Sequence, residues 1–287
     1  MASYEKVYYM IIDSFPFFNE TELCIARLNY LSKAVDKFVI TESNLTWRCK
    51  PNNKKFDDVY KELDDRIKRK INYEFIEHGN EYIDSEEHTN KKTIQNISRD
   101  RLVDIARNIA TDNDIFFYSD LDEFWDTRDK NKIVATLELQ DRIVCNMSSR
   151  FVYADWLGKL PNWPGTRITK LGKIQQDRPL SAGVFRYSKS GAFNRHYAID
   201  SGWHFTYFGS NIQREEKMSN IKNGMDWEAK KQMTYAEIAA SVNTVSDWNR
   251  VVRKKKMGVN QMQDPKIDRR LMVELRKFPI FFNKEQI

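Results

Sequence analysis

The strongest constraint on the fold is an alternation of short apolar runs with amphipathic segments through the first half of the chain. Runs rich in β-forming residues predict strands over four ranges, Val7–Ile12, Lys37–Thr41, Ile71–Ile76 and Ile115–Tyr118. Helical spacing of apolar residues predicts helices between them. Strands joined through helices by short connections form right-handed βαβ units. The pattern therefore predicts an α/β fold with a mostly parallel, Rossmann-like sheet and helices on both faces.

The expected helices have recognisable boundaries. Asn19 with Glu22 three residues on fits a capping box at the start of the first helix. Phe56–Lys70 is a charged amphipathic segment and predicts the second helix. A third helix is expected before the fourth strand, on the apolar series Leu102, Ile105, Ala106 and Ile109.

The second half of the chain has a different character. Strand-like segments are expected over Arg142–Val152, Phe185–Tyr187 and Trp203–Phe208, with a loop over Trp156–Gly165. Helical patterns return from Glu215, mainly over Trp227–Ser241 and Val245–Lys256. No internal repeat is present in the sequence.

Composition places the chain among globular proteins of a reducing compartment. Its 287 residues are 41% hydrophobic, enough for a sizeable core, and the net charge of +6 argues only weakly for anionic ligands. The three cysteines form no CxxC pair, which favours a reduced state. Asn-x-Ser/Thr sequons fall inside expected core elements, beginning at Asn19, Asn44, Asn96 and Asn146. The apolar run from Val7 stops at Asp13, too early for a membrane span or signal peptide. We therefore expect a cytoplasmic protein without a transmembrane segment.

Acidic residues follow three of the expected strands: Asp13, Glu42 and the group around Asp120, Asp122 and Glu123. Ligands of open α/β sheets bind beyond the carboxyl ends of the strands. Asp120 and Asp122 are two apart on extended backbone, so both carboxylates can face one ligand. Such a pair suits Mg²⁺ or Mn²⁺ holding a diphosphate. The alternative is an acidic turn in which Asp122 or Glu123 caps the next helix.

Other candidate residues each have a functional and a structural interpretation. His204, between aromatic residues, is either a nitrogen ligand of the cation or a packed structural residue. Lys217 and Arg99 are either cations for a phosphate or solvated helix charges. Tyr153, Trp156 and Trp163 form either a platform for a sugar ring or part of the core. The sequence has no P-loop, no HExxH, no Gly-x-Ser-x-Gly and no GxGxxG after the first strand.

Taken together, these segments resemble glycosyltransferase family 17, which includes enzymes that add a bisecting β-1,4-linked GlcNAc to mannosyl glycoproteins. The resemblance spans roughly residues 8–217 and is thin over residues 78–92. It rests on five motifs in the family's order: Phe17-Phe-Asn-Glu20, Asp36-Lys-Phe-Val-Ile-Thr-Glu-Ser-Asn44, Lys50-Pro51, Asp114-Ile-Phe-Phe-Tyr-Ser-Asp-Leu-Asp-Glu123 and Gly202-Trp-His-Phe205.

The resemblance implies a GT-A fold and an inverting transfer from a UDP-sugar, expected to be UDP-GlcNAc, to a glycan hydroxyl, supported by Mn²⁺ or Mg²⁺. By position, Asp120 and Asp122 match the DxD motif and His204 the Gly-Trp-His histidine, so these three are the expected metal ligands. Glu42, Arg99, Asp120 and Lys217 are expected at the donor. Inversion also needs a carboxylate base. Asp155, Asp200 and Asp226 remain alternative candidates for it. The GT-A catalytic domain is expected over residues 1–230, with a helical extension over residues 231–287 packed on it.

Two other functions compete with this hypothesis. A metal-dependent phosphohydrolase or nucleotidyltransferase could use the same acidic cluster and would need no sugar acceptor. A basic binding protein could use the stretch from Arg250 to Lys256, whose simpler interpretation is a solvated helix face. Such a protein would bind polyanions in a salt-sensitive way without divalent cations.

Overall fold

The computed structural model of the chain describes residues 9–90, 92–158, 162–174, 197–220, 259–261 and 266–282. The strand expected at Phe185–Tyr187, the helices expected at Trp227–Ser241 and Val245–Lys256, and Asp226 lie outside these ranges. So do the expected domain boundary near residue 230 and the basic stretch from Arg250 to Lys256.

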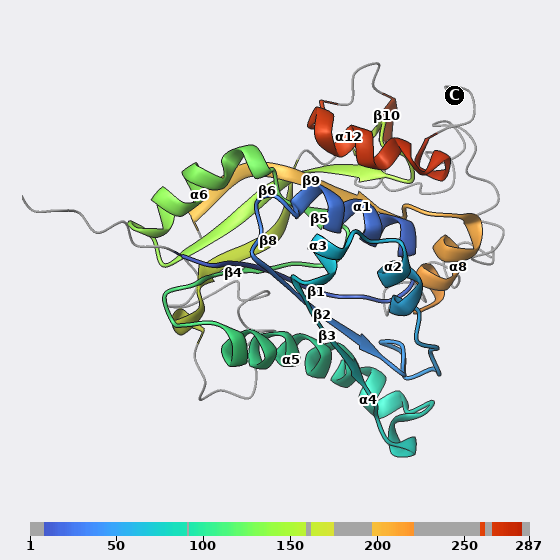
Figure 1. Cartoon of the computed structure of the whole chain (residues 1–287). Coiled ribbons are helices and arrows are strands. Elements are labelled where there is room, and N and C mark those ends of the chain that lie inside the picture. The colour runs from blue at the N-terminus through green and yellow to red at the C-terminus, as the bar shows by residue number, and fades with distance from the viewer. Residues whose placement is uncertain are drawn as a thin grey trace, which may run out of the picture.

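A single mixed sheet forms the centre of the described structure, and its strands follow the order β10-β7-β6-β8-β4-β1-β2-β3 (Figure 1). The first-half strands pair in parallel: β1 (Ile11–Pro16), β2 (Lys37–Ser43), β3 (Ile71–Ile76) and β4 (Ile115–Tyr118). The second-half strands are β6 (Arg142–Phe151), β7 (Trp156–Gly158), β8 (Trp163–Lys170), β9 (Tyr197–Thr206) and β10 (Val259–Gln261). β8 runs antiparallel to both β4 and β6, whereas β9 runs parallel to β6. The expected α/β fold class is confirmed, although the sheet is mixed beyond its parallel first half.

Helices cover both faces of the parallel half because its strands alternate their apolar side chains between two cores. Ile12, Val39 and Phe116 pack with α5 (Thr93–Ile109) on one face. Ile11, Phe15 and Phe38 belong to the larger core on the other face. That core includes residues of three helices, α1 (Thr21–Leu31), α6 (Lys130–Leu137) and α12 (Arg269–Arg276). Figure 1 shows α5 on one side of the sheet, with α1 and α6 on the other.

The remaining described helices are short: α2 (Phe56–Lys61), α3 (Asp65–Lys68), α4 (Glu86–Asn90) and α8 (Asn211–Asn220). Single 3₁₀ turns lie at η1 (Asn80–Tyr82), η2 (Thr127–Asp129), η3 (Leu171–Lys173) and η6 (Pro279–Phe281). No helix within the described ranges combines the length and the apolar character needed to cross a bilayer.

The structure corrects four local predictions. The first strand is β1 at Ile11–Pro16, so Asp13 lies inside it and not at its end. The capping box is absent, because Glu20 is the residue before α1 and the Asn19 amide bonds to Glu216 instead. The second expected helix is two helices, since Asp64 caps a new one by accepting the Arg66 N–H. The expected loop at residues 156–165 holds β7 and the start of β8.

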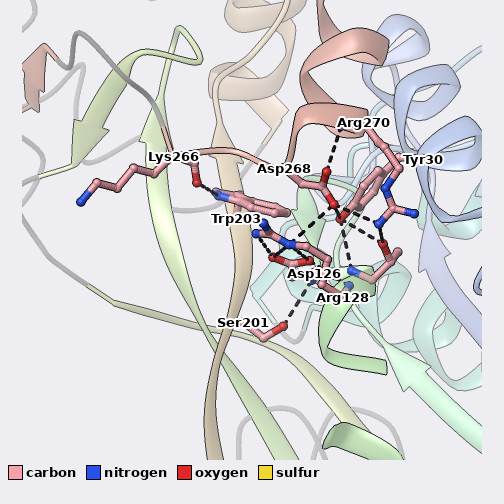
Figure 2. A network of polar contacts seen from close by, with 9 residues as sticks. Tyr30, Asp126, Arg128, Ser201, Trp203, Lys266, Asp268 and Arg270 are labelled. Carbon is pink, nitrogen blue, oxygen red and sulfur yellow. Dashed lines mark hydrogen bonds and ion pairs between the residues drawn. The ribbon is translucent and has the colours of Figure 1, made fainter. Parts of the chain in front are cut away.

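A polar network joins α12 to the rest of the fold (Figure 2). Asp268 accepts the Arg270 N–H at the start of α12 and the Tyr30 hydroxyl of α1, at 2.9 and 3.2 Å. The Arg128 guanidinium lies 3.7 Å from Asp268 and also pairs with Asp126. The helix α12 is thereby held against both α1 and the turn that follows β5 (Glu123–Phe124).

Candidate functional site

A cavity of about 200 Å³ lies beyond the carboxyl ends of β1, β2 and β4. It is lined by residues from segments that are far apart in sequence: Pro16, Phe17, Phe18, Glu20, Thr41, Glu42, Ser43, Leu45, Thr46, Trp47, Asn52, Ser98, Asp120, Leu121, Asp122, Trp163, His204, Lys217 and Asn220. The sequence-predicted residues Glu42, Asp120, Asp122, His204 and Lys217 are all among them.

The pairing of β5 (Glu123–Phe124) with β9 brings Asp122 and His204 together. In this antiparallel pair Glu123 faces His204 and Phe124 faces Trp203. Gly202 permits the close approach: its φ is +89°, and a Cβ there would lie 2.1 Å from the Phe124 carbonyl oxygen. The close approach of the two backbones therefore explains why glycine occupies this position of the Gly-Trp-His segment.

Asp122, Lys217, Glu20 and His204 form a buried ionic cluster on the cavity wall. The Lys217 ammonium donates to Asp122 Oδ2 at 2.7 Å and to Glu20 Oε1 at 2.6 Å. On the other carboxylate oxygen, Asp122 Oδ1 lies 3.5 Å from His204 Nε2. Burial alone would raise the pKa of Asp122, but Lys217 and then His204 hold that pKa well below its usual range. Burial would likewise lower the pKa of Lys217, yet Asp122 and Glu20 raise it above its usual value.

Asp120 has a different environment. Its Oδ1 accepts from Arg99 Nη2 at 2.7 Å, and Arg99 is buried and is not among the cavity-lining residues. The Arg99 guanidinium also lies over the ring of Trp47, 5.3 Å from its centroid. Arg99 therefore acts on the cavity through Asp120 and Trp47.

Glu123 connects the DxD segment to His204. One of its carboxylate oxygens accepts the Asp120 N–H at 3.1 Å, and the other accepts the Trp163 indole N–H at 2.8 Å. The Trp163 ring stacks on His204 with centroids 4.5 Å apart and planes 18° from parallel. This contact fixes the orientation of the imidazole beside Asp122.

Glu42 lines the cavity, but both of its carboxylate oxygens are already hydrogen-bonded. They accept from the backbone N–H groups of Lys55 and Phe56 at 2.6 and 3.2 Å, and from the Tyr73 hydroxyl at 2.7 Å. Burial raises the pKa of Glu42, and the Tyr73 and backbone bonds counter this only in part. The residue holds the start of α2 at the cavity edge.

The candidates for the base are not brought together. Asp155 is buried near Arg150 and outside the cavity lining, and Asp200 is exposed on β9, where it accepts from Asn146 at 3.3 Å. Asp226 lies outside the described residues. Of the three aromatic residues proposed as a platform, Trp163 lines the cavity, while Trp156 is fully buried against Tyr153.

Sequence reasoning gave no role to Arg27, which supports the whole DxD segment. Arg27 is fully buried and pairs through two bonds with Asp13, at 2.8 and 3.0 Å. It also donates to the backbone carbonyls of Asp120, Leu121 and Glu123. The available signal was a cation on the apolar face of the first helix, between Cys24 and Leu31. The sequence likewise indicated no role for Glu20, the last residue of the Phe17-Phe-Asn-Glu20 motif.

Comparisons with known proteins concern the family of the chain. A sequence model of glycosyltransferase family 17 matches residues 3–218. The crystal structure of S. aureus TarS 1-349 is 11% identical to the chain, with a TM-score of 0.39. That match covers 75% of this chain, which in turn spans only 65% of TarS 1-349. None of the curated proteins compared with the chain matches it significantly. On the family match, the chain belongs to glycosyltransferase family 17.

Proposed function

We propose that the protein is an inverting, metal-dependent glycosyltransferase that moves a sugar, expected to be GlcNAc, from a UDP-sugar to a hydroxyl of a glycan. Family membership supports glycosyl transfer over the phosphohydrolase and nucleotidyltransferase alternatives. The charge of the cavity wall is the observation that supports metal dependence.

Carboxylates outnumber cations at this wall. Among the described residues that line the cavity, Glu20, Glu42, Asp120 and Asp122 carry carboxylates and Lys217 is the one lysine or arginine. Arg99 pairs with Asp120 from behind the wall, and Lys54 acts on Glu42. A diphosphate entering this space would meet a net negative charge. A divalent cation would reverse that balance, which favours a metal-supported donor over one held by basic side chains alone.

The residues present fit such a cation, with one change from the sequence-based expectation. Within the described part of the chain, no group of three His, Cys, Asp or Glu side chains could by itself hold an ion. Asp122 Oδ1 and His204 Nε2 are close enough to act as two protein ligands, and phosphate oxygens and water commonly complete such shells. Asp120 is paired with Arg99, and we propose that it supports the cation indirectly, by positioning the segment that carries Asp122. When bound, the cation would neutralise negative charge on the leaving diphosphate.

In the proposed reaction, the acceptor hydroxyl oxygen bonds to the anomeric carbon while the bond from that carbon to the UDP oxygen breaks. The hydroxyl proton passes to a carboxylate base, for which Asp155, Asp200 and Asp226 remain the candidates. Lys217, on the cavity wall, would add positive charge beside the departing UDP.

Substitution of Asp122 tests the metal site. Asp122→Asn should abolish the Mn²⁺-dependent part of UDP binding, because a neutral amide is a poor ligand for a hard cation. Isothermal calorimetry with and without Mn²⁺ gives the measurement, and Asp57→Asn, on the exposed face of α2, is the matched control. His204→Ala should weaken the same binding. If Asp122→Asn binds UDP with unchanged affinity in Mn²⁺, the assignment is wrong.

The stereochemistry of the product tests the reaction class. An α-linked UDP-sugar should give a β-linked product, since a single displacement inverts the anomeric carbon. NMR coupling constants of the anomeric proton report the linkage directly. Replacing the true base by Asn should lower turnover by roughly two to four orders of magnitude while leaving UDP binding intact. An α-linked product would exclude the single displacement.

A further inference from the structure

We propose that Lys217 competes with the cation for the Asp122 carboxylate while no nucleotide is bound, so that cation and nucleotide bind cooperatively. This inference rests on the proposed function and concerns how the same site is loaded.

Lys217 is anchored twice, at 2.6 Å to Glu20 and at 2.7 Å to Asp122, and all three side chains are largely buried. Its contact with Asp122 is on Oδ2, whereas His204 faces Oδ1 of the same carboxylate. A divalent cation bound to Asp122 and His204 would therefore share one carboxylate with an ammonium group. Two positive groups that share one buried carboxylate repel each other strongly.

Glu20 gives Lys217 a second anionic partner, so the ammonium group can leave Asp122 and still be balanced by one negative charge. Lys217 also lines the cavity, where a diphosphate would offer it new oxygen acceptors. A bound diphosphate would thus draw Lys217 away from Asp122 and leave the carboxylate to the cation. By linkage, the nucleotide then raises the affinity for the cation, and the cation raises the affinity for the nucleotide by the same factor.

The experiment measures Mn²⁺ binding by calorimetry and by electron paramagnetic resonance, with and without UDP, in wild-type protein and variants. In the wild type, UDP should tighten Mn²⁺ binding about tenfold or more, within the usual range of such couplings. Lys217→Met should bind Mn²⁺ alone about tenfold more tightly and lose most of the coupling to UDP. Glu20→Gln should weaken the binding of Mn²⁺ alone, because Lys217 then has Asp122 as its remaining carboxylate partner.

Lys55→Met is the matched control, because Lys55 pairs with Glu216 of α8 at 3.2 Å but does not touch Asp122. It should leave the coupling unchanged. A role for Lys217 in phosphate binding alone would weaken UDP equally with and without Mn²⁺, keeping the coupling at its wild-type value, and that result overturns the inference. Thermal melting identifies any variant that fails to fold. If Lys217→Met does not fold, Glu20→Gln provides the test, and an unchanged Mn²⁺ affinity in that variant also overturns the inference.

Failure of the proposed function looks different. If wild-type protein and both variants bind neither Mn²⁺ nor Mn²⁺ with UDP, then the metal site and this inference are both wrong. If the wild type binds Mn²⁺ with UDP but Lys217→Met keeps the full coupling, only the inference fails.

Discussion

Arg27 and Asp13 are a buried ion pair beneath the segment that carries Asp120 and Asp122. Both side chains are fully buried, and the remaining guanidinium donors reach Ser119 Oγ at 2.7 Å and the carbonyls of the DxD turn. The pair therefore sets the height of that turn above the sheet without lining the cavity itself. An acid that a sequence places near a strand end can thus be structural.

Removal of this cation gives a prediction at the residue scale. Arg27→Met should destabilise the fold by about 3–5 kcal/mol, because it leaves the Asp13 carboxylate buried without its cationic partner. Urea unfolding followed by circular dichroism measures the change. Asp13→Asn combined with Arg27→Met should cost less than the sum of the two single changes. Arg66→Met, which breaks a surface pair with Asp64, should leave the midpoint unchanged. An Arg27→Met protein of wild-type stability would contradict this account.

The sequence predicted some residues of the site but not all of their partners. The acidic strand ends, together with the resemblance to glycosyltransferase family 17, predicted that Asp122, His204 and Lys217 serve one site. The structure places Asp122 in contact with the other two. Glu20 pairs with Lys217 and Arg99 pairs with Asp120, and these contacts depend on side-chain geometry that sequence spacing does not encode.

At the scale of elements, the two-residue strand β5 depends on β9. Gly202 allows β9 to pass so close to the Phe124 carbonyl that any side chain at this position would collide with backbone. The contact between Asp122 and His204 follows from this pairing. Strand register thus determines the geometry of the ionic cluster.

Gly202→Ala should therefore damage both stability and the site. The positive φ and the backbone collision should cost at least about 1–3 kcal/mol and displace β5 from β9. We expect a lower melting temperature together with weaker Mn²⁺-dependent UDP binding. Gly165→Ala is the control, because a Cβ there would meet the flexible Met147 side chain, which can move. Equal effects of the two substitutions would argue against a special role for Gly202.

Other elements show where sequence patterns succeed and fail. The strands β2, β3 and β4 and the helix α5 follow from apolar series and were predicted nearly as observed, whereas β1 begins and ends four residues later than expected. The strands β7 and β8 were missed because Pro161, Pro164 and Gly165 dominate a segment whose strand character comes from pairing with distant β4 and β6. Asp64 split the second helix through a capping bond that an amphipathic pattern does not reveal.

At the scale of the whole molecule, the three cysteines lie in the core. Cys24, Cys49 and Cys145 are all fully buried and unpaired. Burial also raises the pKa of the Cys24 and Cys145 thiols, which suppresses their reactive thiolate forms.

The native protein should therefore be inert toward a thiol reagent such as dithionitrobenzoate. In guanidinium chloride, all three thiols should react. The rate of modification without denaturant then reports the opening of the fold, and UDP with Mn²⁺ should slow it if the site binds both. Rapid reaction of one thiol in the native protein would show that its part of the core opens locally.

The pairing of β5 with β9 also bears on the order in which the chain acquires its structure. The β1–α1–β2 unit forms from neighbouring residues, whereas Asp122 meets His204 only after residues 123 and 204 have been brought together across a long intervening segment. Closing such a loop delays contact formation during folding. We therefore expect the ionic cluster to be among the last features to assemble, so that a refolding chain regains most of its secondary structure before it can bind a nucleotide.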